Sequence, residues 1–375
     1  MGLYVGVMSG TSLDAVDVAL IKTAPTEQPR LIAHHTAEFS AELHTALTKL
    51  IRSQQCQLLQ LGELDVQLGH VYADTINTLL KSTGHDASAI DGIGCHGQTI
   101  FHSPDSHYPF SMQIGNGNVI AEKTGITTVC DFRQRDMING GQGAPLVPAF
   151  HAAMFRSDSE NRVIINIGGI SNITILRANQ QSALKGFDTG PGNTLMDAWI
   201  YKHQQKSFDN EGKWAESGRV NQTLLLQLKS ATYFKRPIPK STGCELFNLD
   251  WLDKQLTAAQ CQSIDAEDVQ ATLMDFTVAT IAEAIQQYAS DTHKIYVCGG
   301  GSKNKALMQR LSAELQPIAV DTTAAIGLDP QWVEAAAFAW LAEQTLKHKA
   351  LDLRQVTGAH QPNILGAVYW SRKAS

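Results

Sequence analysis

One pattern occurs near the start of the chain and again near its middle, and it constrains the fold more than any other feature. Residues 3–21 contain an apolar run, a loop of small and hydroxyl-bearing residues, and a second apolar run, and residues 163–177, VIINIGGISNITILR, repeat this plan. The apolar runs predict a strand on each side of each loop. The two segments share little identity, and chance also produces such a pattern in α/β proteins. We therefore expect two sheets, each opened by a strand–loop–strand unit.

The loop at residues 9–12, SGTS, has two interpretations. A glycine among small polar residues suits an ordinary hairpin turn. Alternatively, backbone N–H groups between small side chains can approach an anion closely. Two such loops, one opening each half of the chain, would suit a nucleotide whose phosphates lie between two domains.

Length and composition favour two folded domains. The chain has 375 residues, of which 43% are apolar, enough for a core in each domain. Its net charge is −6 and its Lys and Arg residues form no cluster, which argues against nucleic-acid binding. The six cysteines form no CxxC pair or zinc spacing and indicate reduced thiols in a cytoplasmic protein. We also expect no targeting segment and no membrane span.

Several segments carry helix signals, and one motif is misleading. Apolar spacing predicts helices over residues 40–53, 61–82 and 265–289, and Asp329 with Pro330 predicts the start of another that continues to residue 346. The polar segment 203–218 is expected to be a solvated connector or a lid. Residues 92–97, GIGCHG, match the dinucleotide fingerprint, but strand-like residues follow, so we interpret the match as coincidental. A Walker A loop is absent from the sequence.

Two glycine-rich segments carry candidate ligand contacts. An apolar strand at residues 295–298 is followed by Gly299, Gly300 and Gly301 and then a helix, which favours contact with a phosphate or a flat ligand over a simple turn. Asp188 is predicted to lie in a glycine-rich loop at residues 186–193. Its carboxylate could act as a general base, help to hold a metal, or only form a turn.

Polar residues elsewhere have both a functional and a structural interpretation. Arg133 and Arg135 stand beside a predicted glycine loop and suit a carboxylate or phosphate, although a salt-bridged surface loop fits equally well. His96, taken alone, is best interpreted as a buried core histidine. Glu334, taken alone, favours the N-terminus of its helix through the helix dipole.

Taken together, these segments resemble the anhydro-N-acetylmuramic acid kinases. The motifs occur in order over nearly the whole chain: MSGTSLDAVD, GCHGQT, DFRQRD, GGQGAPLVPAFH, NIGGISN, GFDTGPGN, KSTG, CGGGSKN and the helix that carries Glu334. The resemblance implies an α/β fold of two actin/hexokinase-like (ribonuclease H-like) domains, with mixed sheets flanked by helices and an active-site cleft between the domains. We expect residues 1–130 to form the first domain and 131–349 the second, with room for 350–375 to pack back on the first.

The resemblance also implies an activity and a set of site residues. Enzymes of this family use ATP, with Mg²⁺ expected, to phosphorylate 1,6-anhydro-N-acetylmuramic acid while they hydrolyse its anhydro bond, giving N-acetylmuramic acid 6-phosphate in peptidoglycan recycling. A cytoplasmic homodimer is implied. Asp188 matches the catalytic base, and sugar contacts are implied for His96, Arg133, Arg135 and Glu334. ATP binding is implied for two phosphate hairpins and an adenosine segment: Ser9, Gly10, Thr11, Ser12, Leu13, Asp14, Ala15, Val16, Asp17, Gly168, Gly169, Gly299, Gly300 and Gly301.

The chain departs from the family pattern in places, and two other classes of function compete with a kinase. Residues 7–9 lack the Asp that actin- and Hsp70-like proteins carry before the first phosphate loop, so the metal ligands are left unassigned. Ala15 and Cys244 stand where relatives commonly have Gly and Arg. A regulatory ATPase is the alternative class, but it would not need Asp188 together with the Arg133 loop. A dehydrogenase would require NAD binding at residues 92–97.

Overall fold

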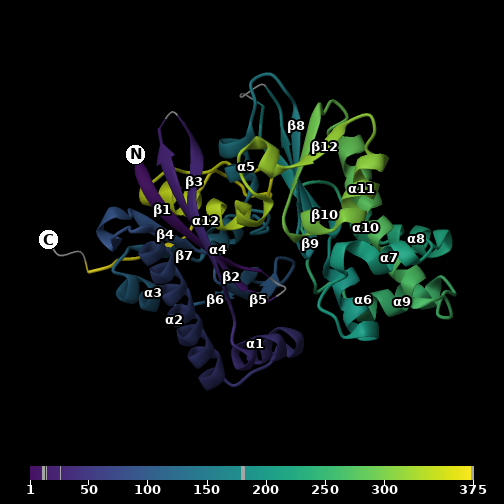
Figure 1. Ribbon diagram of the computed structural model, residues 1–375, viewed down its shortest axis with the longest axis horizontal. Helices are drawn as coiled ribbons and strands as arrows, with labels where there is room; N and C mark the ends of the chain where they lie inside the picture. The colour runs from purple at the N-terminus through teal and green to yellow at the C-terminus, as the bar shows by residue number, and fades with distance from the viewer. Residues whose placement is uncertain (11–12, 14, 26, 179–181, 373–375) are drawn as a thin grey trace. The chain divides into compact units, whose positions relative to one another are not determined.

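The computed structural model describes residues 1–10, 13, 15–25, 27–178 and 182–372 (Figure 1). The chain divides into two compact units, of which the first comprises Met1–Met154 and Trp332–Ser375 and the second Phe155–Gln331. These divisions differ from the expected boundaries at residues 130 and 349. Helix α12 (Val333–Leu346) belongs to the first unit because it packs across strands β1 (Gly2–Ser9) and β4 (Gly92–Cys95).

The sheet of the first unit combines antiparallel and parallel pairing. Strands β1, β2 and β3 form an antiparallel meander, β4 is parallel to β1, and β7 is parallel to β4. The C-terminal strand β13 pairs with β7, so the end of the chain lies in the first unit. Strands β5 and β6 form a separate hairpin. The other strands of this unit are β2 (Ala15–Ala24), β3 (Glu27–Glu38), β7 (Thr128–Cys130) and β13 (Ala367–Tyr369), and the hairpin strands are β5 (Gln98–Ser103) and β6 (Phe110–Ile114).

The sheet of the second unit has the same topology. Its order is β10-β9-β8-β11-β12, again a three-stranded antiparallel meander followed by two parallel strands. Its strands are β8 (Arg162–Ile167), β9 (Ile170–Leu176), β10 (Lys185–Pro191), β11 (Lys294–Cys298) and β12 (Ala319–Thr322). The repeated sequence pattern therefore marks the first hairpin of each sheet, as predicted, and the mixed α/β fold class is confirmed.

The predicted helices form, with small changes at their ends. Ser40 caps α1 by accepting a hydrogen bond from the Leu43 N–H. The helices of the first unit are α1 (Ala41–Ser53), α2 (Leu58–Thr83), α3 (Gly117–Thr124), α4 (Phe132–Ile138) and α5 (Pro148–Phe155), at whose end the second unit begins. Those of the second unit are α6 (Thr194–Gln204), α7 (Lys213–Ser217), α8 (Gln222–Lys229), α9 (Leu249–Ala258), α10 (Ala266–Tyr288) and α11 (Lys305–Glu314).

Two local expectations are resolved by the structure. The segment 203–218 is not a plain loop, because it contains α7, and the Asp209 carboxylate accepts hydrogen bonds from the N–H groups of Trp214 and Ala215. The fingerprint at residues 92–97 is followed by strand β5 and not by a helix, which confirms that it is not a dinucleotide-binding motif.

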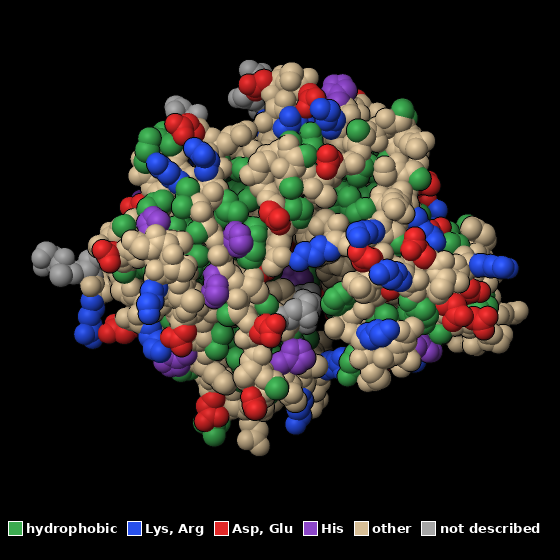
Figure 2. Space-filling model, viewed as in Figure 1, with side chains coloured by type: hydrophobic (Ala, Val, Ile, Leu, Met, Phe, Trp, Pro, Cys, Tyr) green, Lys and Arg blue, Asp and Glu red, His purple; other side chains and the backbone are tan. Residues whose placement is uncertain are grey.

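The surface and the core agree with the composition. Each unit has its own apolar core, formed in the first by the sheet with α1 and α2 and in the second by the sheet with α10 and α11. On the face shown in Figure 2, basic and acidic side chains are interspersed and do not gather into one basic area. Within the described part of the chain, no helix is both long and apolar enough to cross a membrane.

Candidate functional site

Three glycine-containing loops meet in the second unit, at the carboxyl ends of β8 and β11. The carbonyl of Gly169 accepts hydrogen bonds from Gly192 N at 2.9 Å and Thr194 N at 3.1 Å, which ties the first loop to the second. Gly299, at φ +80°, lies so close to strand β8 that a Cβ there would overlap the Asn166 side-chain oxygen. A residue at position 299 must adopt a positive φ and leave room for Asn166, and only glycine does both. The three loops thus form one surface lined by backbone.

Asp188 lies beside this surface, but on a strand and not in a loop as expected. The segment that carries it pairs with β9 to form β10, and the pairing register shifts between Asp188 and Gly190. The side chain is 4% exposed, and its Oδ2 accepts a hydrogen bond from the Thr242 N–H at 3.0 Å. Its own N–H donates to Lys240 O at 3.0 Å, and its carbonyl accepts the Tyr233 hydroxyl at 2.6 Å. Asp188 is thus held in one position by residues 233–242.

A row of polar side chains crosses the sheet at the level of Asp188. Asn172 on β9 is the register partner both of Asp188 on β10 and of Asn166 on β8, so the three side chains share one face. The Asn172 Oδ1 is buried without a hydrogen-bond donor, and so are the hydroxyl oxygens of Ser241 and Thr242. Buried polar atoms are normally paired, so these oxygens indicate groups able to receive a ligand.

Several described residues of the first hairpin in the first unit have buried side chains. Ser9, the last residue of β1, has its hydroxyl 2.7 Å from that of Tyr72 on α2, and both residues are buried. The side chains of Leu13 and Val16 are buried in the core, so only their backbone is available to a ligand. Asp17 accepts a hydrogen bond from Thr36 on β3. Gly10 precedes Thr11, Ser12 and Asp14, which lie outside the described residues, and Ala15 begins β2.

His96 and Arg133 are in direct contact. The guanidinium Nε and Nη2 atoms lie 3.0 and 2.8 Å from His96 Nε2, and Nη1 donates to Gly143 O at 2.7 Å. Since Nε2 accepts these bonds, the Nδ1–H donates to the Gly97 carbonyl at 2.7 Å. Burial, aided by the nearby Arg133 charge, holds the pKa of His96 well below its usual value. The histidine is therefore both buried and neutral, and it fixes the guanidinium.

The other two predicted sugar contacts, Arg135 and Glu334, are placed differently. Arg135 lies on helix α4, as Arg133 does, because residues 132–138 form nearly two turns of helix before the glycines. Arg135 is exposed and two positions from Arg133, so the two side chains leave different faces of the helix. Glu334 is half-buried in the first turn of α12, one turn before Phe338, whose ring is 4.7 Å from that of His96.

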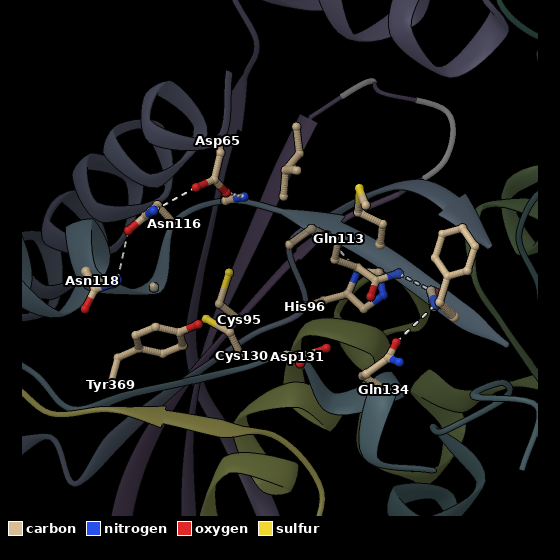
Figure 3. A pocket seen from close by; sticks show the side chains of 17 residues that line it. Asp65, Cys95, His96, Gln113, Asn116, Asn118, Cys130, Asp131, Gln134 and Tyr369 are labelled. Carbon is tan, nitrogen blue, oxygen red and sulfur yellow. Dashed lines mark hydrogen bonds between the residues drawn. The ribbon is translucent and has the colours of Figure 1, made fainter. Parts of the chain in front are cut away.

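A pocket of about 410 Å³ opens beside His96 in the first unit (Figure 3). It is formed by the β5–β6 hairpin, the N-terminal end of α3, and the ends of β4, β7 and β13. Amides dominate its polar lining, and Asp65 and Asp131 are its charged residues, with neither Lys nor Arg among the described residues that line it. The Asp65 carboxylate is already engaged with Gly115 N at 2.8 Å and with the Asn116 amide at 2.7 Å. The amides of the lining suit the hydroxyl and amide groups of a ligand.

Some residues of this geometry were not singled out from the sequence. Asn172 and Thr242 lie in quoted motifs, NIGGISN and KSTG, but neither was assigned a role. Because residues 186–193 were expected to form a loop, the pairing of Asn172 with Asp188 was not predicted. Nothing local signals Tyr72, because its contact with Ser9 joins residues 63 positions apart.

Comparisons with known proteins cover almost the entire chain. Residues 2–371 match the model of a family described as "Anhydro-N-acetylmuramic acid kinase". A protein of that name from Pasteurella multocida is 50% identical over 371 residues, which cover 99% of this chain and 97% of that protein. Another, from Coxiella burnetii (strain RSA 493 / Nine Mile phase I), is 46% identical over 370 residues, which cover 99% of this chain and 98% of that protein. A ROK family glucokinase from Streptomyces griseus in complex with glucose and AMPPNP has a TM-score of 0.38 and 13% identity, covering 92% of this chain and 100% of that chain.

Proposed function

Because the chain belongs to the anhydro-N-acetylmuramic acid kinase family, it is an ATP-dependent kinase of that sugar, and we propose that Asp188 is its catalytic base. The position of Asp188 carries this proposal. Its carboxylate is held by the Thr242 N–H, and it stands beside glycine loops that a phosphate chain can approach. A fixed carboxylate next to a phosphate surface suits proton abstraction coupled to phosphoryl transfer.

In the proposed reaction, one base assists two bond changes. Asp188 takes a proton from a water molecule, whose oxygen bonds to the anomeric carbon of the sugar. The bond from that carbon to the bridging oxygen breaks, and the released oxygen, still bound to C6, attacks the γ-phosphorus of ATP. The products are N-acetylmuramic acid 6-phosphate and ADP, and the proton remains on Asp188 until solvent removes it.

ATP binding is assigned to backbone surfaces in both units. In the second unit, Gly168 and Gly169 would contact phosphates, and residues 299–301 would lie against the adenosine. At Gly168 and Gly300 the nearest atoms to a Cβ would be 3.6 and 3.9 Å away, which leaves their backbone open to a ligand. In the first unit, Gly10 and the backbone of the first hairpin would provide further N–H donors. The resemblance between the two hairpins, each the opening of a sheet of the same topology, supports this pairing of roles.

The described residues fit a Mg²⁺ ion that arrives with ATP. They contain no group of three or more His, Cys, Asp or Glu side chains that could hold a metal alone, but Mg²⁺ usually takes only one or two protein oxygens beside phosphate and water. The buried Oδ1 of Asn172, without a donor and next to Asp188, is such an oxygen. When bound, the ion would offset negative charge on the phosphates.

We assign the sugar to the pocket beside His96. Its amide lining suits the ring hydroxyls and the acetamido group of an amino sugar. The carboxylate of the muramic acid would point away from Asp65 and Asp131, because like charges repel. Arg133, which His96 holds beside the pocket, would be the cation nearest to this carboxylate. The family resemblance supports a cytoplasmic homodimer that acts in peptidoglycan recycling.

Mass spectrometry of the product tests the coupled reaction. The protein is incubated with MgATP and 1,6-anhydro-N-acetylmuramic acid in ¹⁸O-water, and the expected product carries one phosphate and one solvent oxygen. Release of ADP with unmodified sugar would instead identify a regulatory ATPase.

The role of Asp188 has its own test. Asp188→Asn removes the proton acceptor but keeps the shape, so sugar phosphorylation should fall by about 10²–10⁴-fold while ATP binding, measured by calorimetry, is retained. Asp250→Asn, at an exposed position in the same unit, is the matched control and should leave both unchanged. Turnover of Asp188→Asn near that of the unsubstituted protein would refute the assignment.

A further inference from the structure

Two cysteines lie on neighbouring strands at the wall of the pocket. Gly94 on β4 is the register partner of Val129 on β7, so the next residues, Cys95 and Cys130, are also neighbours. Adjacent strands are about 4.8 Å apart, inside the range of about 4.4–6.8 Å that separates the Cα atoms of disulfide-bonded cysteines. Equivalent positions on parallel strands direct their side chains to the same face of the sheet.

The two thiols are neighbours and border open space. Cys95 is close enough to Cys130 to affect its ionisation. Both residues line the pocket, between Tyr369 and His96 (Figure 3). Cys95 is fully buried and Cys130 is half-buried, so a small molecule in the pocket would reach Cys130 first.

The remaining cysteines have other surroundings. Cys56 is exposed, and Cys244 lies 3.3 Å from the Thr194 hydroxyl. Cys261 and Cys298 are buried and contact oxygen atoms, among them the Ala259 carbonyl at 3.3 Å and the Asn166 side chain at 3.7 Å. The pocket pair is therefore distinguished by its neighbouring positions on adjacent strands and by access from a cavity.

We propose that Cys95 and Cys130 form an oxidation site, at which a small peroxide joins the two thiols in a disulfide and thereby impairs the sugar pocket. Cys130 attacks the peroxide as the thiolate, its sulfur bonds to one oxygen, the O–O bond breaks and one water leaves. Cys95 then displaces hydroxide from the Cys130 sulfenic acid, which leaves as the second water. The balance is two thiols and one H₂O₂ to one disulfide and two waters, with sulfur oxidised and peroxide oxygen reduced.

The environment of the pair sets its reactivity. The neighbouring Cys95 thiol, together with burial and the nearby acidic groups, raises the pKa of the Cys130 thiol. Because the thiolate is the reactive form, the pair stays reduced unless the oxidant is abundant. Oxidation is therefore a response to peroxide stress and not a resting state of the protein.

The expected effect on the sugar follows from the neighbouring residues and rests on the proposed function. His96 directly follows Cys95, and Arg133 is three residues after Cys130, so both strand ends lead into the His96–Arg133 contact. A disulfide brings the two sulfurs to about 2.05 Å and reorients both side chains at the wall of the pocket. A misplacement of about 1 Å at a binding site can cost about 10²-fold in rate.

The bond itself is tested without substrate. The full chain is reduced, freed of reductant, treated with hydrogen peroxide, unfolded and alkylated with iodoacetamide, and its tryptic peptides are analysed by mass spectrometry. We expect a linked pair of peptides containing Cys95 and Cys130, with the other cysteines alkylated. The unsubstituted protein suffices for this measurement, so it does not depend on whether a core variant folds. Full alkylation of both residues, or their linkage to other cysteines instead, would overturn the proposal.

Activity measurements then test the effect on the pocket. Oxidation should lower kcat/KM for the sugar by about tenfold to a hundredfold, in step with formation of the linked peptide, and dithiothreitol should restore it. Cys130→Ser should retain, after peroxide treatment, all of the activity that it has before treatment, whereas Cys56→Ser, at an exposed position, should lose activity with peroxide as the unsubstituted protein does. A linked peptide with unchanged kinetics would refute the effect on the pocket, while an inactive reduced protein that still forms the link would refute only the proposed function.

Discussion

At the scale of single residues, the least expected contact is the hydrogen bond between Tyr72 and Ser9. Tyr72 is fully buried, and its hydroxyl lies 2.7 Å from the Ser9 hydroxyl, at the point where β1 enters the first hairpin. The backbone of Gly115, at φ +127°, packs against the tyrosine ring. Helix α2 therefore supports both the hairpin and one wall of the pocket through a single side chain.

Removal of this hydroxyl should weaken ATP binding. Tyr72→Phe leaves the buried Ser9 hydroxyl with only its long contact to the Gly97 carbonyl at 3.5 Å, which costs about 1–3 kcal/mol and loosens the hairpin entry, so KM for ATP should rise. Ser9→Ala should act through the same bond, and the double variant should therefore be no worse than either single one in a double-mutant cycle.

A buried hydroxyl on the same helix provides the comparison. Thr75 donates to the Val71 carbonyl of its own helix at 2.7 Å, so Thr75→Val should leave KM for ATP unchanged. If Tyr72→Phe lowered only the melting temperature and left KM for ATP as it was, the contact would have a structural role alone.

At the scale of elements, the close approach of α12 to the first sheet is the main organising contact. A Cβ at Gly6 on β1 would overlap the Ala335 carbonyl, and one at Gly94 on β4 would overlap the Phe338 carbonyl. Two glycines on neighbouring strands therefore let the helix backbone lie directly on the sheet. The same contact explains why this helix belongs to the first unit and not, as expected, to the second.

The glycine at position 94 should not tolerate a methyl group. Gly94→Ala places a carbon against backbone that cannot rotate away, so the free energy of unfolding should fall by about 1–3 kcal/mol or more in urea titrations. Gly62→Ala, in the exposed interior of α2 with nothing near its Cβ, should instead raise it by about 0.5–1 kcal/mol. Equal stability of the two variants would show that α12 can shift freely.

At the scale of the whole molecule, the protein is expected to lose stability in acid through buried histidines. Burial lowers the pKa of His151 on α5 to about 3, and burial together with the Arg133 charge lowers the pKa of His102 to about 4. These imidazoles stay neutral in the folded protein, whereas in the unfolded chain they take up protons below about pH 6.5. The unfolded state then binds more protons, so stability falls as the pH falls from about 6.5 toward the folded pKa values.

The contribution of one histidine can be measured. His151→Leu removes a titrating group of similar size, so between about pH 6 and 4 the free energy of unfolding should fall less steeply, by about 1.4 kcal/mol per pH unit. The slope is the readout, because the substitution also changes packing. His107→Gln, at an exposed position, should keep the original slope. An unchanged slope for His151→Leu would mean that its neighbours relax to admit the charge.

The sequence alone determined the local features and the family. Apolar periodicity predicted the strands and long helices, the glycine loops predicted the turns at the carboxyl ends of strands, and the ordered motifs indicated the family over the full chain. These signals depend on a few neighbouring residues, because strand alternation, helical spacing and glycine conformation are local properties.

Only the tertiary structure decided which side chains meet. Strand register brings Asn172 beside Asp188 and Cys95 beside Cys130, and helix packing assigns α12 to the first unit. It also decides that Arg133, and not Arg135, contacts His96. Register and helix orientation are set by burial of apolar faces between segments far apart in the chain, so no local pattern could reveal these contacts.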